Sequence, residues 1–165
     1  MSTVSIVVDA PADLVFALCR DVERWQVLLP HYVRSRRVSS ASGPSLVVDF
    51  VARRPLLDVL GLGLPVAWRA RTWNEPGSRR LWFRHLAGAT RGMEVSWRIE
   101  PEPSGCRVSI EHVFAPRLPG WAGLIDRAFT QPIASRTLTT FKAIAEALTE
   151  AELESGRASR PKKTS

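Results

Sequence analysis

Long hydrophobic runs are missing from this chain of 165 residues, and its first residues lack a basic, apolar leader. No apolar run approaches the roughly 18 to 20 residues that a membrane-spanning helix needs. The opening MSTVSIVVDAP has neither the basic start nor the long apolar centre of a secretion signal. We therefore expect a cytoplasmic protein without a membrane span.

Cysteine is scarce, and the signatures of several enzyme classes are missing. Cys19 and Cys106 form no CxxC pair, and we expect both thiols to be reduced. The three histidines and the scattered carboxylates show no metal-ligand spacing. The chain has no GxSxG, GxGxxG or P-loop motif. These absences argue against a metal centre and against the sites that those motifs build.

Tyrosine is scarce among the aromatic residues: the chain has one Tyr but six Trp and six Phe. Large apolar rings suit either a deep core or the walls of an apolar cavity. Hydrophobic residues make up 45% of the chain, which is typical of a globular protein. We expect one domain over residues 1–152.

The chain has a formal net charge of +7, and part of that charge lies at its C-terminal end. The segment 153–165 is polar, contains a proline and carries several basic residues, so we expect a disordered basic tail. Such a tail is either a solvated end or an electrostatic handle for an acidic partner.

The first third of the chain predicts a strand followed by two short helices. Residues 3–9 form a β-branched run, and Pro11 and Asp13 suit the first turn of the helix after it. A second short helix follows, with Asp21 as its expected N-cap, and ends at Pro30. Its expected apolar face consists of Val22, Trp25, Leu28 and Leu29.

Six more strands and a long helix are predicted after Pro30. The strands are expected at residues 32–40, 46–54, 66–73, 79–86, 92–102 and 105–114. The last two alternate cleanly between apolar and polar residues, which indicates an antiparallel sheet with one wet face. Residues 121–152 have helical periodicity, and Pro132 should kink this helix or start a new one near Gln131. The predicted fold is α+β: a seven-stranded, curved antiparallel sheet wrapped on the long C-terminal helix, with a hollow between them.

Two stretches resemble a known superfamily, the START-like and Bet v 1-type helix-grip proteins. They are IVVDAPADLVFALCRDVERW…LLPHY at residues 6–32 and the EP…GCRVSIEHVF pattern at residues 100–114. Within that superfamily the chain is most similar to the polyketide cyclase/dehydrase branch and to the coenzyme Q-binding and RatA-like proteins. The resemblance covers about residues 3–150. One departure is Gln26, where the family usually has a proline after the tryptophan.

This resemblance implies an apolar cavity between sheet and helix. Aromatase/cyclases of the family fold a poly-β-ketone there, close a ring by an aldol reaction and remove water, without a metal or an organic cofactor. Tyr32 matches a tyrosine of these enzymes, and a phenol can donate a hydrogen bond to a ketone. His85 lies on the strand where they place a cavity arginine, and Thr72 stands where they keep another arginine.

The candidate catalytic residues are therefore Tyr32, His85 and His112. His112 follows Val108 and Ile110 on the inward face of the last strand, where a core histidine is the alternative interpretation. His31 is expected to point to solvent. The candidate ligand-binding residues are Trp68, Thr72, Phe83, Met93, Trp97, Ile110 and Phe129.

The position of the arginines decides how well the cyclase chemistry fits. Alternation places Trp68, Ala70 and Thr72 inside and the arginines between them outside, whereas a slip of one residue would bring Arg69 and Arg71 inside. Arginines also stand at 34, 36 and 37. Alternation cannot place all three on one side of a strand, and one that faces inward could replace the arginine missing at Thr72.

The connection at residues 55–65 is apolar and contains two glycines and two prolines. It is expected to be a hydrophobic lid over the cavity or a foot for peripheral contact with a membrane, and the alternative is a loop packed on the core.

Three functions are compatible with these features. The first is an aromatase/cyclase or dehydratase acting on a polyketide bound to an acyl carrier protein, which is acidic and would be attracted to the basic surface. The second is a non-catalytic carrier of a quinone, fatty acid or polyprenyl lipid. The third is a macromolecular binder of the RatA type. A nucleic-acid partner is disfavoured, because the chain lacks interleaved exposed aromatics and a dense basic stripe.

Overall fold

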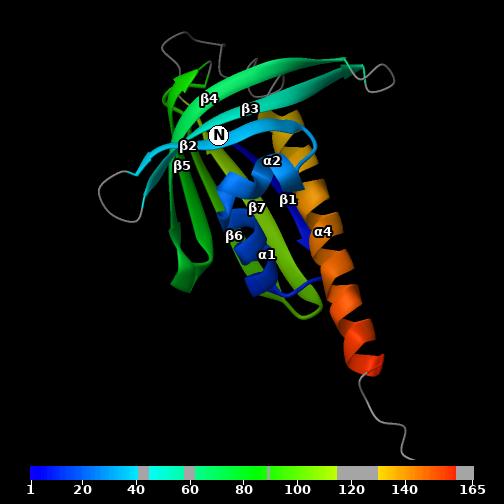
Figure 1. Cartoon of the computed structure of the whole chain (residues 1–165). Coiled ribbons are helices and arrows are strands. Elements are labelled where there is room, and N and C mark those ends of the chain that lie inside the picture. The colour runs from blue at the N-terminus through cyan, green and yellow to red at the C-terminus, as the bar shows by residue number, and fades with distance from the viewer. Residues whose placement is uncertain (41–44, 58–61, 89, 115–129, 159–165) are drawn as a thin grey trace, which may run out of the picture.

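The computed structural model describes residues 1–40, 45–57, 62–88, 90–114 and 130–158 (Figure 1). Its elements in chain order are β1 (Ser2–Val8), α1 (Ala12–Arg20), η1 (Val22–Arg24), α2 (Trp25–Leu28), β2 (Tyr32–Ser40), β3 (Leu46–Leu57), β4 (Leu62–Glu75), η3 (Pro76–Ser78), β5 (Arg80–Gly88), β6 (Glu94–Glu102), β7 (Gly105–Val113) and α4 (Gln131–Ala158).

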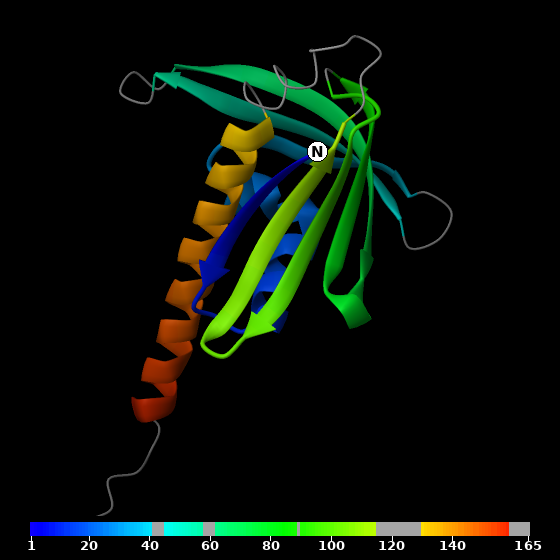
Figure 2. The same ribbon diagram turned by 180° about the vertical axis from the view of Figure 1, so that it is seen from behind.

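The seven strands form one antiparallel sheet in the order β1-β7-β6-β5-β4-β3-β2. The sheet curves around α4, and α1 and α2 lie on the same side of the sheet as that helix (Figures 1 and 2). This arrangement confirms the predicted α+β helix-grip fold.

Alternation along the strands sends one set of side chains to the concave face and the other to solvent. On β6, Val95, Trp97 and Ile99 are buried, whereas Glu94 and Glu100 on either side of this stretch are exposed. Antiparallel strands can keep one wet face because a strand places successive side chains on opposite sides. The concave face therefore carries the apolar core, as the alternation predicts.

The two short helices fill one end of this concave face. α1 follows Pro11, and its buried face includes Val15 and Cys19. Asp13 in its first turn pairs with Arg79 at the start of β5, with Nε and Oδ1 2.6 Å apart. Asp21 precedes η1 as expected, but its side chain makes no capping hydrogen bond, so the predicted N-cap is wrong in that respect.

Trp25 is the centre of the aromatic core. Its Nε1 donates to the carbonyl oxygen of Cys19 at 3.0 Å, which satisfies the buried indole N–H. Its ring lies within 6 Å of five other rings, namely Tyr32, Phe50, Phe83, Trp97 and Phe141. The second short helix is thereby fixed beneath the sheet.

Gln26, the residue that departs from the family pattern, ties this helical segment to the sheet. Its Oε1 accepts a hydrogen bond from the backbone N–H of Ser35 at 3.2 Å, and the Ser35 hydroxyl donates to the Val22 carbonyl. β2 is the last strand of the sheet, and an edge strand exposes backbone groups that need partners. Proline has no side-chain acceptor and could not make this contact.

The long helix begins at Gln131, with Pro132 in its first turn, where a missing N–H costs no helical hydrogen bond. The prediction that Pro132 kinks a longer helix or starts a new one depends on residues 121–129, which lie outside the described residues. α4 continues to Ala158 instead of ending near Glu152. Residues 151–154 are good helix formers and contain no glycine or proline, so nothing in this stretch ends the helix.

The connection predicted at residues 55–65 is mostly a β-hairpin. β3 extends to Leu57, β4 begins at Leu62, and Pro55 stands opposite Gly63. The antiparallel pairing of the preceding residues continues into the segment, and a register shift between Pro55 and Leu57 accommodates the proline. The expected irregular loop is therefore wrong, and the role of this segment as a lid or foot stays a prediction. Residues 58–61 lie outside the described part of the chain.

Candidate functional site

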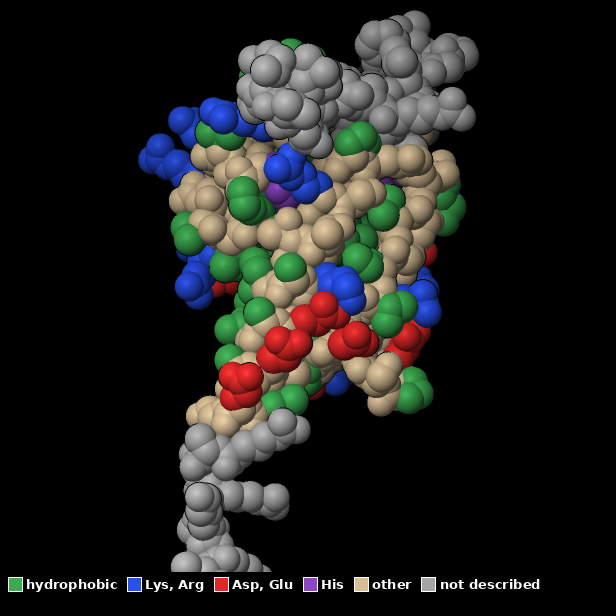
Figure 3. Space-filling view, turned by 90° about the vertical axis from the view of Figure 1, so that its right-hand side faces the viewer, with side chains coloured by type: hydrophobic (Ala, Val, Ile, Leu, Met, Phe, Trp, Pro, Cys, Tyr) green, Lys and Arg blue, Asp and Glu red, His purple; other side chains and the backbone are tan. Residues whose placement is uncertain are grey.

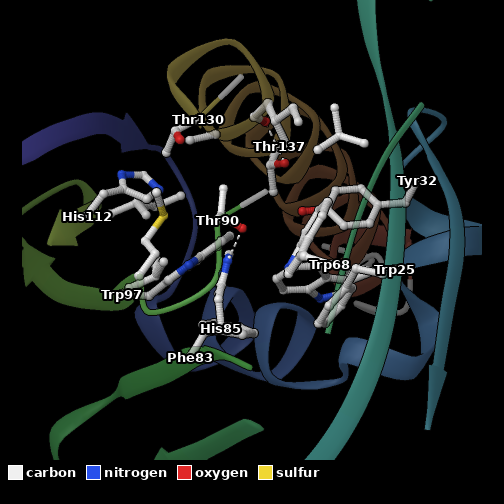
Figure 4. Close-up of a pocket in the computed structure, with 17 residues that line it drawn as sticks. Trp25, Tyr32, Trp68, Phe83, His85, Thr90, Trp97, His112, Thr130 and Thr137 are labelled. Atoms are coloured by element: carbon white, nitrogen blue, oxygen red, sulfur yellow. Dashed lines mark hydrogen bonds between the residues drawn. The ribbon is translucent and has the colours of Figure 1, made fainter. Parts of the chain in front are cut away.

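An aromatic cavity lies between the concave face of the sheet and the first turns of α4 (Figure 4). It holds about 600 Å³ of empty space, solvent at its opening included. Its described lining residues are Trp25, Tyr32, Phe50, Val66, Trp68, Phe83, His85, Thr90, Met93, Val95, Trp97, Ile110, His112, Thr130, Ile133, Ala134 and Thr137. The wall thus contains no Asp, Glu, Lys or Arg among the residues that the structure describes.

The cavity occupies one half of the concave face, and packed side chains fill the other half. On β4 the wall includes Trp68, whereas Ala70 and Thr72 lie in the closed half. Thr72 is buried, but it does not line the cavity, which corrects its prediction as a ligand-binding residue. Thr72 misses the cavity because it lies in the closed half, where α1 and α2 pack against the sheet.

Most of the other predicted ligand-binding residues do line the cavity. These are Trp68, Phe83, Met93, Trp97 and Ile110. Phe129 lies outside the described residues. The predicted catalytic residues Tyr32, His85 and His112 also line the cavity, and their roles stay predictions.

His85 and Thr90 form one polar pair in the wall. The Nδ1 of His85 lies 2.6 Å from the Thr90 hydroxyl oxygen, and the imidazole stacks on the Trp68 ring with centroids 5.8 Å apart. Burial, and to a smaller extent the nearby His112, lowers the pKa of His85 to about 3. An imidazole with that pKa is neutral at pH 7.

Tyr32, Thr137 and His31 form a second polar cluster. His31 Nε2 lies 2.9 Å from the Thr137 hydroxyl, and that hydroxyl also hydrogen-bonds with the Tyr32 phenol. His31 is 2% exposed, so the prediction that it points to solvent is wrong. Its ring packs edge-on against the Tyr32 ring, and both residues follow the turn that Pro30 starts, which directs them under the sheet.

Burial sets the charge state of this cluster. It raises the pKa of the Tyr32 phenol, opposed in part by the hydrogen bond with Thr137, and Tyr32 therefore stays protonated at pH 7. Burial, with a smaller contribution from Arg136, lowers the pKa of His31 to about 4. The Thr137 hydroxyl oxygen also lies 2.8 Å from the carbonyl oxygen of Ile133, so this one hydroxyl links α4 with both His31 and Tyr32.

The chain matches a known protein family over most of its length. Residues 2–146 match the family described as polyketide cyclase / dehydrase and lipid transport. The chain belongs to this family. No curated protein matches the chain with significance.

The fold of this polyketide cyclase/dehydrase-family protein recurs in solved structures. Zhui aromatase/cyclase from Streptomyces sp. R1128 superposes with a TM-score of 0.72 at 18% identity, over 88% of this chain and 92% of that one. TTHA0849 from Thermus thermophilus has a TM-score of 0.68 at 19% identity, over 88% and 97%. The di-domain aromatase/cyclase BexL of the BE-7585A biosynthetic pathway has a TM-score of 0.69 at 26% identity, over 90% of this chain and 47% of that one.

In this family member the arginines of β4 lie outside the cavity. Arg69 is exposed on the convex face, where its Nε and Nη2 donate to the two carboxylate oxygens of Asp49 at 2.6 and 2.9 Å. Arg71 is exposed as well. The register of β4 is therefore the one in which Trp68 and Thr72 face inward, and the slipped alternative is excluded.

The arginines of β2 also miss the cavity, which corrects the idea that one of them replaces the arginine missing at Thr72. Arg34, Arg36 and Arg37 are all exposed, and Arg37 pairs with Glu23. Register shifts near both ends of the strand break the simple alternation, so that Ser35 is the buried position among them.

Sequence reasoning overlooked three polar residues of the site, Thr90, Thr130 and Thr137, and misplaced a fourth, His31. Thr90 lies in the turn between β5 and β6. His31 immediately precedes β2, Thr130 immediately precedes α4, and Thr137 lies on α4. The helical spacing of α4 could have indicated Thr137, because it lies four residues, about one turn, before the apolar Phe141, which is buried. The described residues contain no group of three or more metal-binding side chains, and no described helix is long and apolar enough to cross a membrane.

Proposed function

We propose that the cavity binds a neutral polyketide-class molecule and that the protein acts on it as an aromatase/cyclase. The single observation that carries this proposal is the wall itself. It combines two uncharged clusters, one at Tyr32 and one at His85, and the polar residues His112 and Thr130 with a surface that is otherwise aromatic and aliphatic. Such a wall favours a ligand made of apolar rings or chains with carbonyl and hydroxyl groups.

Tyr32 is the group that would polarise a carbonyl. A phenol that stays protonated can donate a hydrogen bond to the oxygen on which negative charge develops in an aldol step. In that step a proton leaves the carbon between two carbonyls, this carbon bonds to a second carbonyl carbon, and the oxygen of that carbonyl takes up a proton. Loss of water from the alcohol and enolisation of the remaining ring carbonyls then give the aromatic ring.

His85 is the group that would take part in the proton transfer. Its imidazole is neutral and therefore has a free lone pair at pH 7, and Thr90 orients the ring through Nδ1. A pKa of about 3 makes it a weak base, so the proposal requires that the β-dicarbonyl proton is acidic and that Tyr32 stabilises the enolate.

A second candidate is a carrier that binds such a molecule without converting it. Two observations favour it: the described cavity wall lacks charged residues, and the pKa of His85 is far below the optimum for a general base at neutral pH. The two candidates share a ligand class and differ in turnover.

Delivery by an acyl carrier protein is part of the proposal. On the face drawn in Figure 3, acidic side chains gather toward the C-terminal end of α4, whereas basic ones are spread over the face and include a group toward the opposite end. An acidic carrier would be repelled from the first end and attracted to the second, where the first turns of α4 line the cavity.

The test is a reconstituted reaction in which a carrier-bound poly-β-ketone is offered to the protein and the cyclised products are analysed by mass spectrometry. We expect the wild-type protein to shift the product profile, and Tyr32→Phe and His85→Phe to abolish the shift while their melting temperatures stay near that of the wild type. Thr139→Val, on the exposed side of α4, is the matched control and should behave as wild type. Tight binding without any change in products would establish the carrier, and neither binding nor conversion would refute both candidates.

A further inference from the structure

Thr130 differs in its hydrogen bonding from the Tyr32 and His85 clusters of the cavity wall. The residue is 9% exposed and lines the cavity, and its side-chain oxygen is buried without a hydrogen-bond partner. By contrast, Tyr32 bonds with Thr137, and His85 bonds with Thr90. Nearly all buried hydroxyl groups in proteins are paired, because a buried polar group without a partner destabilises the fold. An unpaired hydroxyl in a cavity wall therefore points to a ligand that completes it.

The position of Thr130 defines a second polar end of the cavity. Thr130 immediately precedes α4 and stands seven residues, or two helical turns, before Thr137. Residues two turns apart lie on the same side of a helix and about 10 Å apart along its axis. Figure 4 accordingly shows Thr130 on the side of His112, and Thr137 on the side of Tyr32.

We infer that Thr130 is a ligand-recognition residue and that the ligand carries hydrogen-bonding oxygen atoms at both ends of a fused ring system. This inference rests on the proposed function and narrows its ligand class. One end of the ligand would bond to Tyr32 and the other end to Thr130. The aromatic rings between the two ends of the cavity, Trp68, Phe83 and Trp97, would contact the faces and edges of the fused rings.

Lipids with one polar head fit this cavity less well. A fatty acid or a polyprenyl lipid that places its head at Tyr32 leaves the Thr130 hydroxyl facing a hydrocarbon chain. The carboxylate of a fatty acid would also lack a cation among the described lining residues. A ring system with oxygen at both ends would give the Thr130 hydroxyl a hydrogen-bond partner and would bring no charge into the cavity.

The test compares two coloured ligands, 2,6-dihydroxyanthraquinone with an oxygen at each end and 2-hydroxyanthraquinone with an oxygen at one end, by absorbance titration. We expect the wild type to bind the dihydroxy compound more tightly, by about two- to tenfold, the usual effect of one neutral hydrogen bond. Thr130→Val should remove this preference, because valine has the same shape without the hydroxyl. Thr139→Val should keep the preference, since its hydroxyl bonds to the carbonyl oxygen of Ser135 on the exposed side of α4.

Thermal melting of the ligand-free variants is a second measurement. If Thr130 had a purely structural role, the change in melting temperature would have the opposite sign. Removing an unpaired buried hydroxyl should leave the melting temperature of Thr130→Val equal to or higher than that of the wild type. A lower melting temperature would show that the hydroxyl is already bonded within the protein and would overturn the inference.

The titration separates the failure of this inference from the failure of the proposed function. If Tyr32→Phe weakens both ligands while Thr130→Val leaves the preference intact, the inference about Thr130 falls and the proposed binding function stands. If the wild-type protein binds neither ligand, both fall.

Discussion

At the residue scale, the site depends on imidazoles and phenols that burial holds in their neutral forms. His31 shows the consequence for stability. Its pKa is lowered from 6.5 to about 4 by burial, with Arg136 nearby. In the unfolded chain the same ring takes up a proton near pH 6.5. Between these two values the unfolded state binds more protons than the folded state, and stability falls as the pH falls.

We predict that His31 makes the free energy of unfolding depend on pH between pH 7 and about pH 4.5. The single ring should account for a loss of about 2 kcal/mol over this range, as the shifted pKa implies. His31→Asn keeps a donor beside Thr137 but has no group that titrates there. Over the same pH range, the unfolding free energy of this variant should therefore fall by about 2 kcal/mol less than that of the wild type. Urea unfolding of both proteins at the two pH values measures the difference. Parallel pH profiles would show that the pKa of His31 is the same in the folded and the unfolded protein.

The residues of the site differ in how far the sequence alone could predict them. Tyr32 and His85 were predicted because the resemblance to the aromatase/cyclases places a tyrosine at the first position and a cavity residue on the strand of the second. Thr130 and Thr137 were not predicted, because threonine is common on protein surfaces. The roles of these two residues come from their place in the folded chain: Thr137 bonds to the distant His31, and the hydroxyl of Thr130 is buried.

At the element scale, the fold followed from periodicity, and the errors lie where the periodicity is broken. The strand boundaries predicted for β2 match those observed, and most others differ by a few residues. β-Bulges caused the failures that matter for function. The register shifts of β2 expose all three of its arginines, and no residue pattern marks such a bulge when the strand is polar. The hairpin of β3 and β4 was missed because its glycines and prolines are usual in loops.

Gly88, at the end of β5, positions the turn that carries Thr90. Its φ is +95°, and a Cβ at this position would lie 2.4 Å from the Ala67 carbonyl oxygen and 2.9 Å from the Trp68 Cα. β5 shifts register against β4 just before this point, between Arg69 and Ala70, which leaves His85 directed inward. A side chain at Gly88 would therefore push β5 away from β4 beside the cavity wall.

We predict that Gly88→Ala lowers both stability and ligand binding more than Gly92→Ala does. The two glycines form a matched pair, because Gly92 also has a positive φ, +88°, but open space where its Cβ would stand. Gly92→Ala should show the left-handed backbone strain alone, about 1–2 kcal/mol, whereas Gly88→Ala adds the clash with β4. Chemical denaturation and titration with 2,6-dihydroxyanthraquinone measure the two effects. Equal losses in the two variants would rule out the close approach of β5 to β4 as their cause.

At the scale of the whole molecule, the concave face is solid over one half and hollow over the other. α1 and α2 fill the solid half together with the middle of α4, where Leu138, Phe141 and Ala145 are buried. The hollow half lies under the first turns of the same helix. One helix therefore supports a packed core and lines a binding cavity, so the stability of the fold does not require the cavity to be filled.

This division predicts opposite results for the same substitution at two positions of α4. Ala134 lines the cavity and Ala145 lies in the packed core, and both are buried. Leucine side chains on a helix point back toward its N-terminus, so Ala134→Leu should fill the space beside Thr130. Because it adds apolar contacts without displacing any, we expect it to preserve or raise the melting temperature while it blocks 2,6-dihydroxyanthraquinone. Ala145→Leu has no such space, and overpacking should destabilise it by about 1–3 kcal/mol. Melting curves and absorbance titrations of both variants provide the comparison. Similar destabilisation at the two positions would mean that the hollow half is packed in solution, and undiminished binding by Ala134→Leu would place the ligand elsewhere.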